Sequence, residues 1–328
     1  MLVVGPNGAG KTNLLESLHV GTQGFSPRTR ADSQLVRFGS ETARVAVQGM
    51  RGSVRVETEV VVRVAGAKEI SLNGARLPTT ERLRSELSTL VFTPDRLAVV
   101  KGGPAVRRAY FDRSISRLIP ARAPLPVAYA EVLGQRNAAL RRVGQGLAGR
   151  DAVAPWTQRL ADLAAALVAA RRRVLELLSP GFGERAGELG LEGAVLVYAG
   201  EPPTVASLEA RLARDLERGS TGAGPHLDEI RILSGGRDLR TFGSQGEQRL
   251  AVLALLLAEA ELIAERRPAP PLLLLDDVLS ELDPGRCRKL AARIAARGQA
   301  IVTATSRKAL PAEPDQVLEV SPGRIAEG

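Results

Sequence analysis

A glycine-rich segment near the start of the chain restricts the possible folds more than any other feature of the sequence. It matches the pattern G-x-x-x-x-G-K-[ST] in full and consists of Gly5, Pro6, Asn7, Gly8, Ala9, Gly10, Lys11 and Thr12. Apolar residues precede the segment, and an amphipathic stretch from Lys11 to about Val20 follows it. In such a strand–loop–helix context, backbone N–H groups surround phosphate oxygens at the positive end of the helix. The sequence therefore predicts a P-loop nucleotide-binding domain.

Side chains of this segment have expected roles that follow from their chemistry. We expect Lys11 to contact the β- and γ-phosphates of ATP and to take part in catalysis. The Thr12 hydroxyl is expected to ligate Mg²⁺. Asn13 follows directly, so the predicted ATP-binding set in this region spans residues 5–13.

A second chemical signal is an apolar strand, Leu272 to Leu275, that ends in Asp276 and Asp277. A buried strand presents acidic groups at its tip, where a metal ion offsets their desolvation. Asp276 is the predicted Mg²⁺ partner, either directly or through water. Asp277 is the predicted catalytic residue, at the position where many ATPases of this type have a glutamate that polarises the attacking water. Because aspartate is one methylene shorter, we expect slow hydrolysis.

A Gly-Ser-Gln-Gly loop precedes the acidic strand and opens a predicted helix from Glu247 to Glu265. It resembles the ABC signature motif, in which a hydroxyl and helix N-terminal amides meet the γ-phosphate bound by a second subunit. We therefore assign Ser244, Gln245 and Gly246 to ATP binding across a homodimer. A helix N-cap without a ligand is the alternative for this loop.

Two further segments fit the same class of ATPase. Residues 280–283, Ser-Glu-Leu-Asp, match the D-loop that crosses the dimer seam. The final predicted strand, Ala300 to Ala304, is followed by Thr305 where ABC transporters usually have a histidine. This difference argues against a transport motor.

The order of patterns predicts an α/β fold: an ATPase head with a mostly parallel sheet, an antiparallel β subdomain and an inserted helical arm without a long coiled coil. We expect the first part of the head at 1–112, the arm at 113–219 and the second part of the head at 220–328. Val-rich residues 43–64 and the Asn73-Gly74 turn indicate the antiparallel strands. In the arm, breaks such as Pro180–Gly183 are expected to limit helix length.

Composition favours a polyanionic partner, although an Arg-rich composition from a GC-rich genome is an alternative explanation. Lys and Arg total 45 and Asp and Glu 36, which gives a net charge of +9. Cys287, between Arg286 and Arg288, is expected at an exposed helix position, and a single cysteine is consistent with a reducing cytoplasm. We find no charged-then-apolar leader and no apolar run of the ~18 residues that a membrane helix needs, so we expect no membrane partner.

Taken together, the motifs resemble the RecF family over nearly the whole chain and in the expected order. The resemblance rests on residues 5–13, 92–95, 100–104, 107–112, 224–226, 243–246 and 274–283. It implies an ATP-dependent homodimer that binds gapped or junction DNA and works with RecR and RecO in loading RecA onto single-stranded DNA. It also implies roles in recombinational gap repair, replication restart and the SOS response, with slow, DNA-stimulated hydrolysis of ATP.

Two departures from the family pattern bear on these expectations. Family members usually begin with a strand pair before the P-loop, whereas this chain starts four residues upstream of it. We therefore expect either a start codon set too late or a truncated product, with weaker nucleotide binding and stability. Leu227 follows Gly224-Pro225-His226 where the family tends to have arginine. We expect His226 to be a turn residue with no catalytic role.

Basic side chains are candidates for DNA contact. Lys101, Arg107 and Arg108 lie in a segment punctuated by glycine and proline and are assigned here to DNA phosphates, with a structural role equally open. Arginines on helices of the arm are expected on a solvated surface; they are Arg136, Arg141, Arg142 and Arg171–Arg173. Aromatic residues make up 3% of the chain, so contact with the DNA backbone is favoured over base stacking.

The favoured hypothesis is a DNA-binding switch in which two heads enclose two ATP molecules. An ABC transport motor and a non-hydrolysing DNA-binding scaffold are the alternatives.

Overall fold

The computed structural model describes residues 1–29, 31–280, 282–295 and 298–328, which divide into two units. Unit 1 comprises Met1–Leu97, Gly181–Glu192 and Gly243–Gly328. Unit 2 comprises Ala98–Pro180 and Gly193–Phe242. The second unit therefore extends beyond the arm expected at 113–219 on both sides, while residues 181–192 pack within the first unit.

The main sheet of unit 1 has the strand order β13-β12-β1-β11-β10-β6. Its strands are β1 (Leu2–Val4), β6 (Thr89–Phe92), β10 (Leu272–Leu275), β11 (Ala300–Ala304), β12 (Val317–Ser321) and β13 (Arg324–Glu327). Neighbouring strands are parallel except for the antiparallel pair β12 and β13. The inner strands are almost entirely buried, as expected for near-continuous apolar runs in a parallel sheet. The predicted mostly parallel sheet is thus confirmed.

Among the helices described in unit 1 are α1 (Lys11–Gln23), α2 (Thr80–Glu86), α10 (Gln245–Arg266) and α11 (Pro284–Ala295). Helix α10 is buried from Gln248 to Ala260, so its apolar interior belongs to the core of unit 1. Short 3₁₀ turns lie at Asp32–Leu35, Pro94–Leu97 and Arg307–Ala309 in this unit, and at Pro120–Arg122 and Arg150–Val153 in unit 2.

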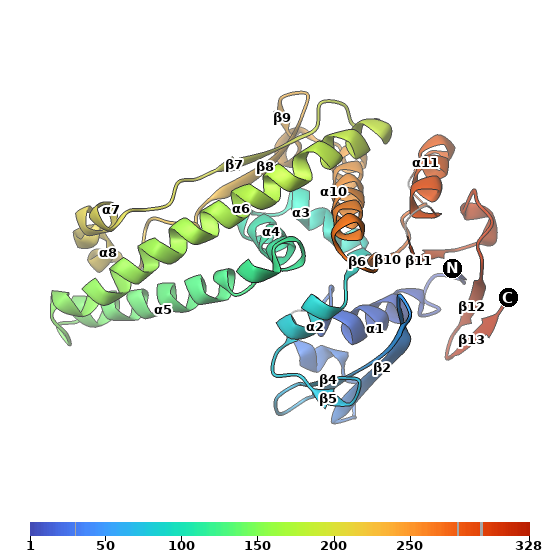
Figure 1. The fold of residues 1–328 in the computed structure, drawn as a ribbon, viewed down its shortest axis with the longest axis horizontal. Helices are drawn as coiled ribbons and strands as arrows, with labels where there is room; N and C mark the ends of the chain where they lie inside the picture. Colours follow the sequence, from blue (N-terminus) through green and yellow to red (C-terminus); the bar gives the residue numbers. More distant parts are fainter. Residues whose placement is uncertain (30, 281, 296–297) are drawn as a thin grey trace. The chain divides into compact units, whose positions relative to one another are not determined.

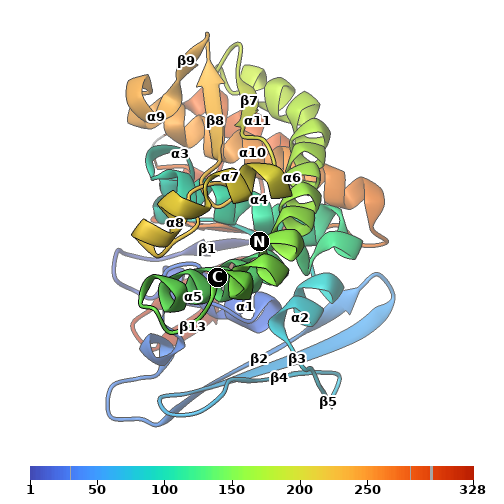
Figure 2. The ribbon, with the colours of Figure 1, turned by 90° about the vertical axis from the view of Figure 1, so that its left-hand side faces the viewer.

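An antiparallel sheet completes unit 1, with α1 and α2 on one of its faces (Figure 2). Its strands in order are β2 (Thr42–Arg51), β3 (Val54–Arg63), β4 (Glu69–Leu72) and β5 (Ala75–Arg76). Val60, Val62 and Ile70 from the sheet pack with Val20 of α1 and Leu83 of α2. Asn73 and Gly74 both have positive φ in the tight turn between β4 and β5, as their sequence predicts.

Unit 2 is mainly helical, and its long helices α5 and α6 are prominent in Figure 1. Its helices are α3 (Ala98–Lys101), α4 (Pro104–Leu118), α5 (Leu125–Gly144), α6 (Ala154–Glu188) as far as Pro180, α7 (Val205–Ala210), α8 (Leu212–Arg218) and α9 (Leu239–Phe242). A three-stranded antiparallel sheet joins β7 (Val195–Ala199), β8 (Glu229–Ser234) and β9 (Arg237–Asp238). Strand β7 lies in the region expected to be helical, because a five-residue β-prone run between glycines is too short to stand out.

Helix α6 also differs from the prediction, because it continues through Pro180 to Glu188. A proline inside a helix removes one backbone hydrogen bond and usually ends or kinks the helix. Here Leu178 and Phe182, on either side of Pro180, are fully buried, so packing compensates for the missing bond. The expected break at Pro180–Gly183 is therefore wrong.

In the part of the chain that the structure describes, none of the helices combines the length and the apolar character needed to cross a lipid bilayer.

Candidate nucleotide-binding site

The glycine-rich loop connects β1 directly to α1, which is the strand–loop–helix arrangement that the sequence predicted. Gly5 must be a glycine, because a Cβ at this position would lie 2.3 Å from the carbonyl oxygen of Val320. Gly10, at the N-cap of α1, has a φ of 106°, which side chains rarely adopt. The loop between them is exposed at Pro6, Asn7 and Gly8. It is therefore open to a phosphate group at the N-terminus of α1.

Lys11 begins α1 and folds back over the loop. Its Nζ donates hydrogen bonds to the carbonyl oxygens of Gly5 (2.7 Å) and Pro6 (2.9 Å). The ammonium group is thus held at the loop that it would share with a bound phosphate. Thr12 is half-buried and Asn13 is exposed in the first turn of the same helix.

The two aspartates follow β10 at the edge of the sheet where β1 and β11 also end, because the three strands are parallel and adjacent. Asp276 is buried, whereas Asp277 is exposed. Asp277 has a φ of 48°, in the left-handed region that non-glycine residues adopt rarely, although aspartate and asparagine adopt it more readily than most. Contacts of the surrounding structure help to hold this backbone in place.

Thr303 in β11 contacts both aspartates, a connection that the sequence did not indicate. Its hydroxyl donates to Asp276 Oδ1 at 2.8 Å and accepts the backbone N–H of Asp277 at 2.9 Å. The residue is fully buried, which is consistent with a structural contact between neighbouring strands. Since partners across a sheet cannot be identified from one strand alone, only a correct β10–β11 register would have revealed it.

The signature loop forms the start of α10, with Ser244 as its N-cap. Ser244 Oγ accepts the N–H of Glu247 at 3.2 Å, and the Glu247 carboxylate accepts the N–H of Ser244 at 2.7 Å. This capping box matches the alternative that the sequence left open. The capping box does not occupy all hydrogen-bonding capacity of Ser244, however, because its hydroxyl proton remains available to donate. Ser244, Gln245 and Gly246 are all exposed.

The predicted D-loop follows β10, although Glu281 lies outside the described residues. Ser280 is exposed, and Asp283 caps α11 by accepting the N–H of Arg286 at 3.0 Å. This hydrogen bond is the main reason that the pKa of Asp283 is lowered. Thr305 is exposed just beyond β11.

The expectation of an exposed Cys287 is wrong. Its thiol is buried, 3.6 Å from the carbonyl oxygen of Leu282, and burial raises its pKa. Helix neighbours point about 100° apart, so Arg286 and Arg288 say little about the direction of the residue between them.

The candidate DNA-contacting residues belong to unit 2 and differ in exposure. Lys101 is exposed at the end of α3. Arg107 is buried and uses four hydrogen bonds internally, two to Glu229 and one each to the carbonyl oxygens of Val100 and Gly102. The geometry therefore favours a structural role for Arg107, which the sequence left open.

Arg108 is half-buried, and its guanidinium donates to the carbonyl oxygen of Asp228 at 2.7 Å. Burial, followed by the nearby charge of Arg171, lowers its pKa. Of the candidate DNA contacts in unit 2, Lys101 is thus the most accessible.

Of the arginines expected on a solvated face of the arm, Arg141 and Arg142 are exposed as expected, whereas others are buried. Arg171 is buried and pairs with both oxygens of Asp112, at 2.7 and 2.9 Å. Although burial opposes it, this contact raises the pKa of Arg171. Only Arg173 of the three consecutive arginines has the largely exposed side chain that was expected.

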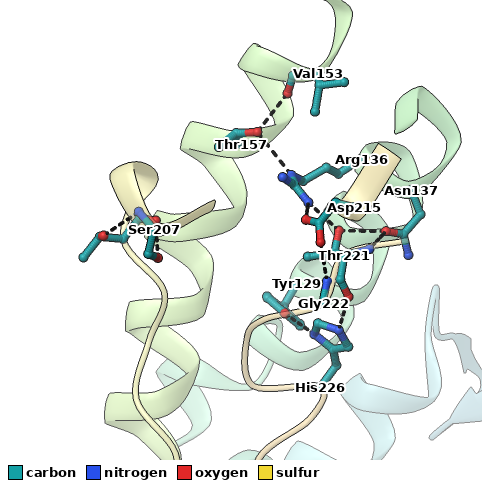
Figure 3. Close-up of polar contacts among 11 residues, drawn as sticks. Tyr129, Arg136, Asn137, Val153, Thr157, Ser207, Asp215, Thr221, Gly222 and His226 are labelled. Carbon is teal, nitrogen blue, oxygen red and sulfur yellow. Dashed lines mark hydrogen bonds and ion pairs between the residues drawn. The ribbon is translucent and has the colours of Figure 1, made fainter. Parts of the chain in front are cut away.

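Arg136 is also buried, at the centre of a polar network between α5, α6 and the segment after α8 (Figure 3). It pairs with Asp215 at 2.9 Å and donates to the hydroxyls of Thr221 (2.7 Å) and Thr157 (3.1 Å). Period-3.6 patterns identify helices but cannot show that a charged residue has an internal partner from a distant segment. The expected solvated position of Arg136 is wrong for this reason.

His226 belongs to the same part of unit 2, where its ring contacts Tyr129 and Thr221 (Figure 3). Its Nε2 lies 3.1 Å from the carbonyl oxygen of Thr221, which can only accept, so Nε2 carries the proton. Nδ1 therefore accepts the hydroxyl of Tyr129 at 2.7 Å. Burial is the main cause of a lowered pKa for His226. The contacts agree with the expected structural role.

The sequence of this chain is similar to those of known proteins of the RecF family. The family model of the RecF/RecN/SMC N-terminal domain matches residues 1–325. The chain is 34% identical to the DNA replication and repair protein RecF of Heliobacterium modesticaldum, over 100% of this chain and 91% of the relative. It is 39% identical to RecF of Anaeromyxobacter dehalogenans, over 94% and 86% of the two chains.

Solved structures of RecF are also similar to this chain. A structure of the recombination mediator protein RecF with ATP is 30% identical and has a TM-score of 0.90, covering 100% of this chain and 91% of that chain. An Smc head bound to the winged-helix domain of ScpA is 20% identical with a TM-score of 0.56, a likeness of fold alone.

Proposed function

Because this chain belongs to the RecF family, we propose that it is an ATP-dependent DNA-binding protein of DNA repair and replication. The proposal rests mainly on one observation: the complete phosphate-binding loop and the buried Asp276 lie at the same edge of a parallel sheet. RecF relatives named for DNA replication and repair, and a RecF structure with ATP, support this choice over a transport motor.

The residues present fit a magnesium–ATP complex. The backbone N–H groups of the exposed residues Asn7 and Gly8 and the N-terminus of α1 suit the phosphates, and Lys11 would neutralise part of their charge. Thr12 and Asp276 would hold Mg²⁺, which supplies charge neutralisation at the phosphate oxygens. A buried carboxylate at a strand tip is a costly arrangement unless a cation compensates it. Asp276 therefore supports this assignment.

ATP would link two copies of the chain in this proposal. Ser244, Gln245 and Gly246 are exposed at the N-terminus of a 22-residue helix, whose partial positive charge attracts an anion. The free hydroxyl proton of Ser244 can donate to a γ-phosphate held by the other copy. Asp277, exposed beside Asp276, would orient the attacking water, and its short side chain would make turnover slow.

DNA would bind through its phosphates. A net charge of +9 provides the long-range attraction, and Lys101 is an exposed candidate contact. Gapped or junction DNA as the preferred substrate, RecR and RecO as partners, and help in loading RecA remain part of the proposal through family membership. The RecF protein solved with ATP is described as a recombination mediator in the RecFOR pathway, which supports the choice of partners.

Sedimentation of the Asp277→Asn variant with ATP and Mg²⁺ tests the switch. Asparagine keeps the size of the side chain and tolerates the left-handed backbone, so the fold should persist while turnover slows about 100-fold or more. We expect a dimer with ATP and a monomer without it. Lys11→Ala under the same conditions is the matched control and should stay monomeric. A monomeric Asp277→Asn protein at saturating ATP would contradict the dimer model.

A further inference from the structure

The two aspartates after β10 are connected by one hydroxyl on the neighbouring strand. The chain of hydrogen bonds runs from Asp277 N–H to Thr303 Oγ1, and from the Thr303 hydroxyl to Asp276 Oδ1. A hydroxyl has one proton, and the Asp277 amide can only donate. The direction of both bonds is therefore fixed, and each strengthens the other.

We propose that Thr303 is a positioning residue for magnesium–ATP, which orients the Asp276 carboxylate and holds the Asp277 backbone in its left-handed conformation. This inference rests on the proposed nucleotide-binding function and extends it to a residue outside the phosphate loop. Thr303 is fully buried and would not touch ATP itself.

The first effect of Thr303 is on the metal ligand. By binding Oδ1, the hydroxyl restrains rotation of the carboxylate, and Asp276 would hold the metal in this fixed orientation. Asp276 is 4% exposed, so water cannot easily replace the lost hydrogen bond in a variant. Removing a group that orients a metal ligand typically lowers metal affinity or activity by about 10–100-fold.

The second effect is on the exposed aspartate. A φ of 48° at Asp277 is unfavourable for a residue with a side chain, and the bond from its N–H to Thr303 is a specific contact that retains it. Without this bond the turn can relax toward a more common backbone conformation. The Asp277 side chain would then no longer be aimed at the attacking water.

The decisive variant is Thr303→Val, which keeps the size and branching of the side chain but removes the hydroxyl. We expect the Mg²⁺ concentration that gives half-maximal ATP binding to rise about 10-fold, and turnover to fall about 10–100-fold. ATP binding in EDTA should not change. Thr303→Ser restores the hydroxyl and should return both values to within about 3-fold of wild type.

Thr58→Val is the matched control. Thr58 is a buried strand threonine of the same unit whose hydroxyl donates to the carbonyl oxygen of Gly21 at 2.7 Å. Its loss should affect stability as Thr303→Val does, without changing the Mg²⁺ dependence. Equal Mg²⁺ dependence in Thr303→Val, Thr58→Val and wild-type protein would overturn the proposal, as would failure of Thr303→Ser to restore it.

A readout without nucleotide separates this proposal from the proposed function. Hydrogen exchange of the nucleotide-free full-length protein should show a protected Asp277 amide in wild type and Thr303→Ser. In Thr303→Val it should exchange at least about 10-fold faster. Free exchange in wild type would overturn the positioning role even if Thr303→Val failed to fold. Protection of the amide in a protein that does not bind ATP would instead contradict the proposed function.

Discussion

The buried charge pair of unit 2 and the exposed groups of unit 1 that we propose for nucleotide binding have different surroundings in the fold. In unit 2, Arg136 and Asp215 are 0% and 1% exposed and are paired with each other. In unit 1, Asp277 and Ser244 are exposed at the ends of their elements, and Asp277 keeps an unfavourable backbone conformation. Burial of charge is costly unless partners compensate it within the protein. The first arrangement therefore serves folding, and the second leaves groups available to a ligand.

Buried, paired residues and exposed residues also both occur among the basic residues of unit 2. Arg107 and Lys101 are six positions apart in unit 2, but Arg107 is enclosed by Glu229 and two carbonyl oxygens, and Lys101 is open to solvent. A positive charge alone is thus a poor guide to DNA contact. Substitutions can test whether internal partners and exposure are better guides.

Removing one partner of the buried pair should have the largest effect on stability. In Asp215→Ala, Arg136 loses its carboxylate, and the N–H of Gly222 loses its acceptor, Asp215 Oδ1 at 3.0 Å. We expect the free energy of unfolding to fall by about 3–5 kcal/mol, measured by urea denaturation.

Glu176→Ala is the control for that experiment, because Glu176 and its partner Arg173 are both about 60% exposed. It should cost less than about 1 kcal/mol. If Asp215→Ala and Glu176→Ala lowered the free energy of unfolding by similar small amounts, the buried network would contribute little to folding and the comparison of the two units would fail.

Lys11→Ala should weaken ATP binding strongly and leave the stability of the fold almost unchanged, unlike Asp215→Ala. We expect ATP affinity to fall about 100-fold, or about 2.7 kcal/mol, because a charged hydrogen-bond donor to the phosphates is lost. Stability should change little, since the lysine donates only to two carbonyl oxygens of a loop that is partly exposed. Calorimetric titration with ATP and thermal unfolding of the same samples measure the two quantities. Unchanged ATP affinity would contradict the assignment of the phosphate site.

The contrast also explains which features could be predicted from sequence. The strand–loop–helix at residues 2–23, the strand that ends before Asp276 and the parallel sheet depend on local patterns, and the structure has them at the expected positions. Thr303, the buried Arg136 and strand β7 depend on partners far along the chain. Local periodicity carries no information on such partners.

Cys287 and Pro180 were misjudged for a related reason. Both predictions used the character of sequence neighbours, whereas tertiary packing determines the outcome. The side of α11 that carries Cys287 faces inward, and Leu178 and Phe182 on either side of Pro180 are buried. Tertiary contacts commonly override local propensity in this way.

The buried, neutral His226 of unit 2 should make the stability of the fold depend on pH. Burial lowers its pKa in the folded protein, whereas the unfolded chain has a pKa near 6.5. Below about pH 6.5 the unfolded state therefore binds a proton that the folded state does not. The free energy of unfolding should fall as pH decreases, by up to about 1.4 kcal/mol per pH unit, until the folded pKa is reached.

Urea denaturation between pH 7.5 and 5 measures this effect, and His226→Gln should lack it. We expect the difference between wild type and variant to be constant above about pH 7 and to change only on acidification. An identical pH dependence in the two proteins would show that His226 does not titrate in the way its contacts with Tyr129 and Thr221 imply.

The smallest expected effect concerns Lys101, the exposed residue in the comparison with Arg107. If Lys101 contacts one DNA phosphate, Lys101→Ala should reduce the slope of log affinity against log salt by about 0.9, with an affinity loss below about 1 kcal/mol. Lys308→Ala removes another exposed lysine, from the 3₁₀ turn of unit 1, and serves as the control for net charge. Fluorescence anisotropy with duplex DNA at several salt concentrations gives both slopes. Equal slopes for the two variants would mean that Lys101 acts only through overall charge, and exposure would then no longer identify the DNA contact.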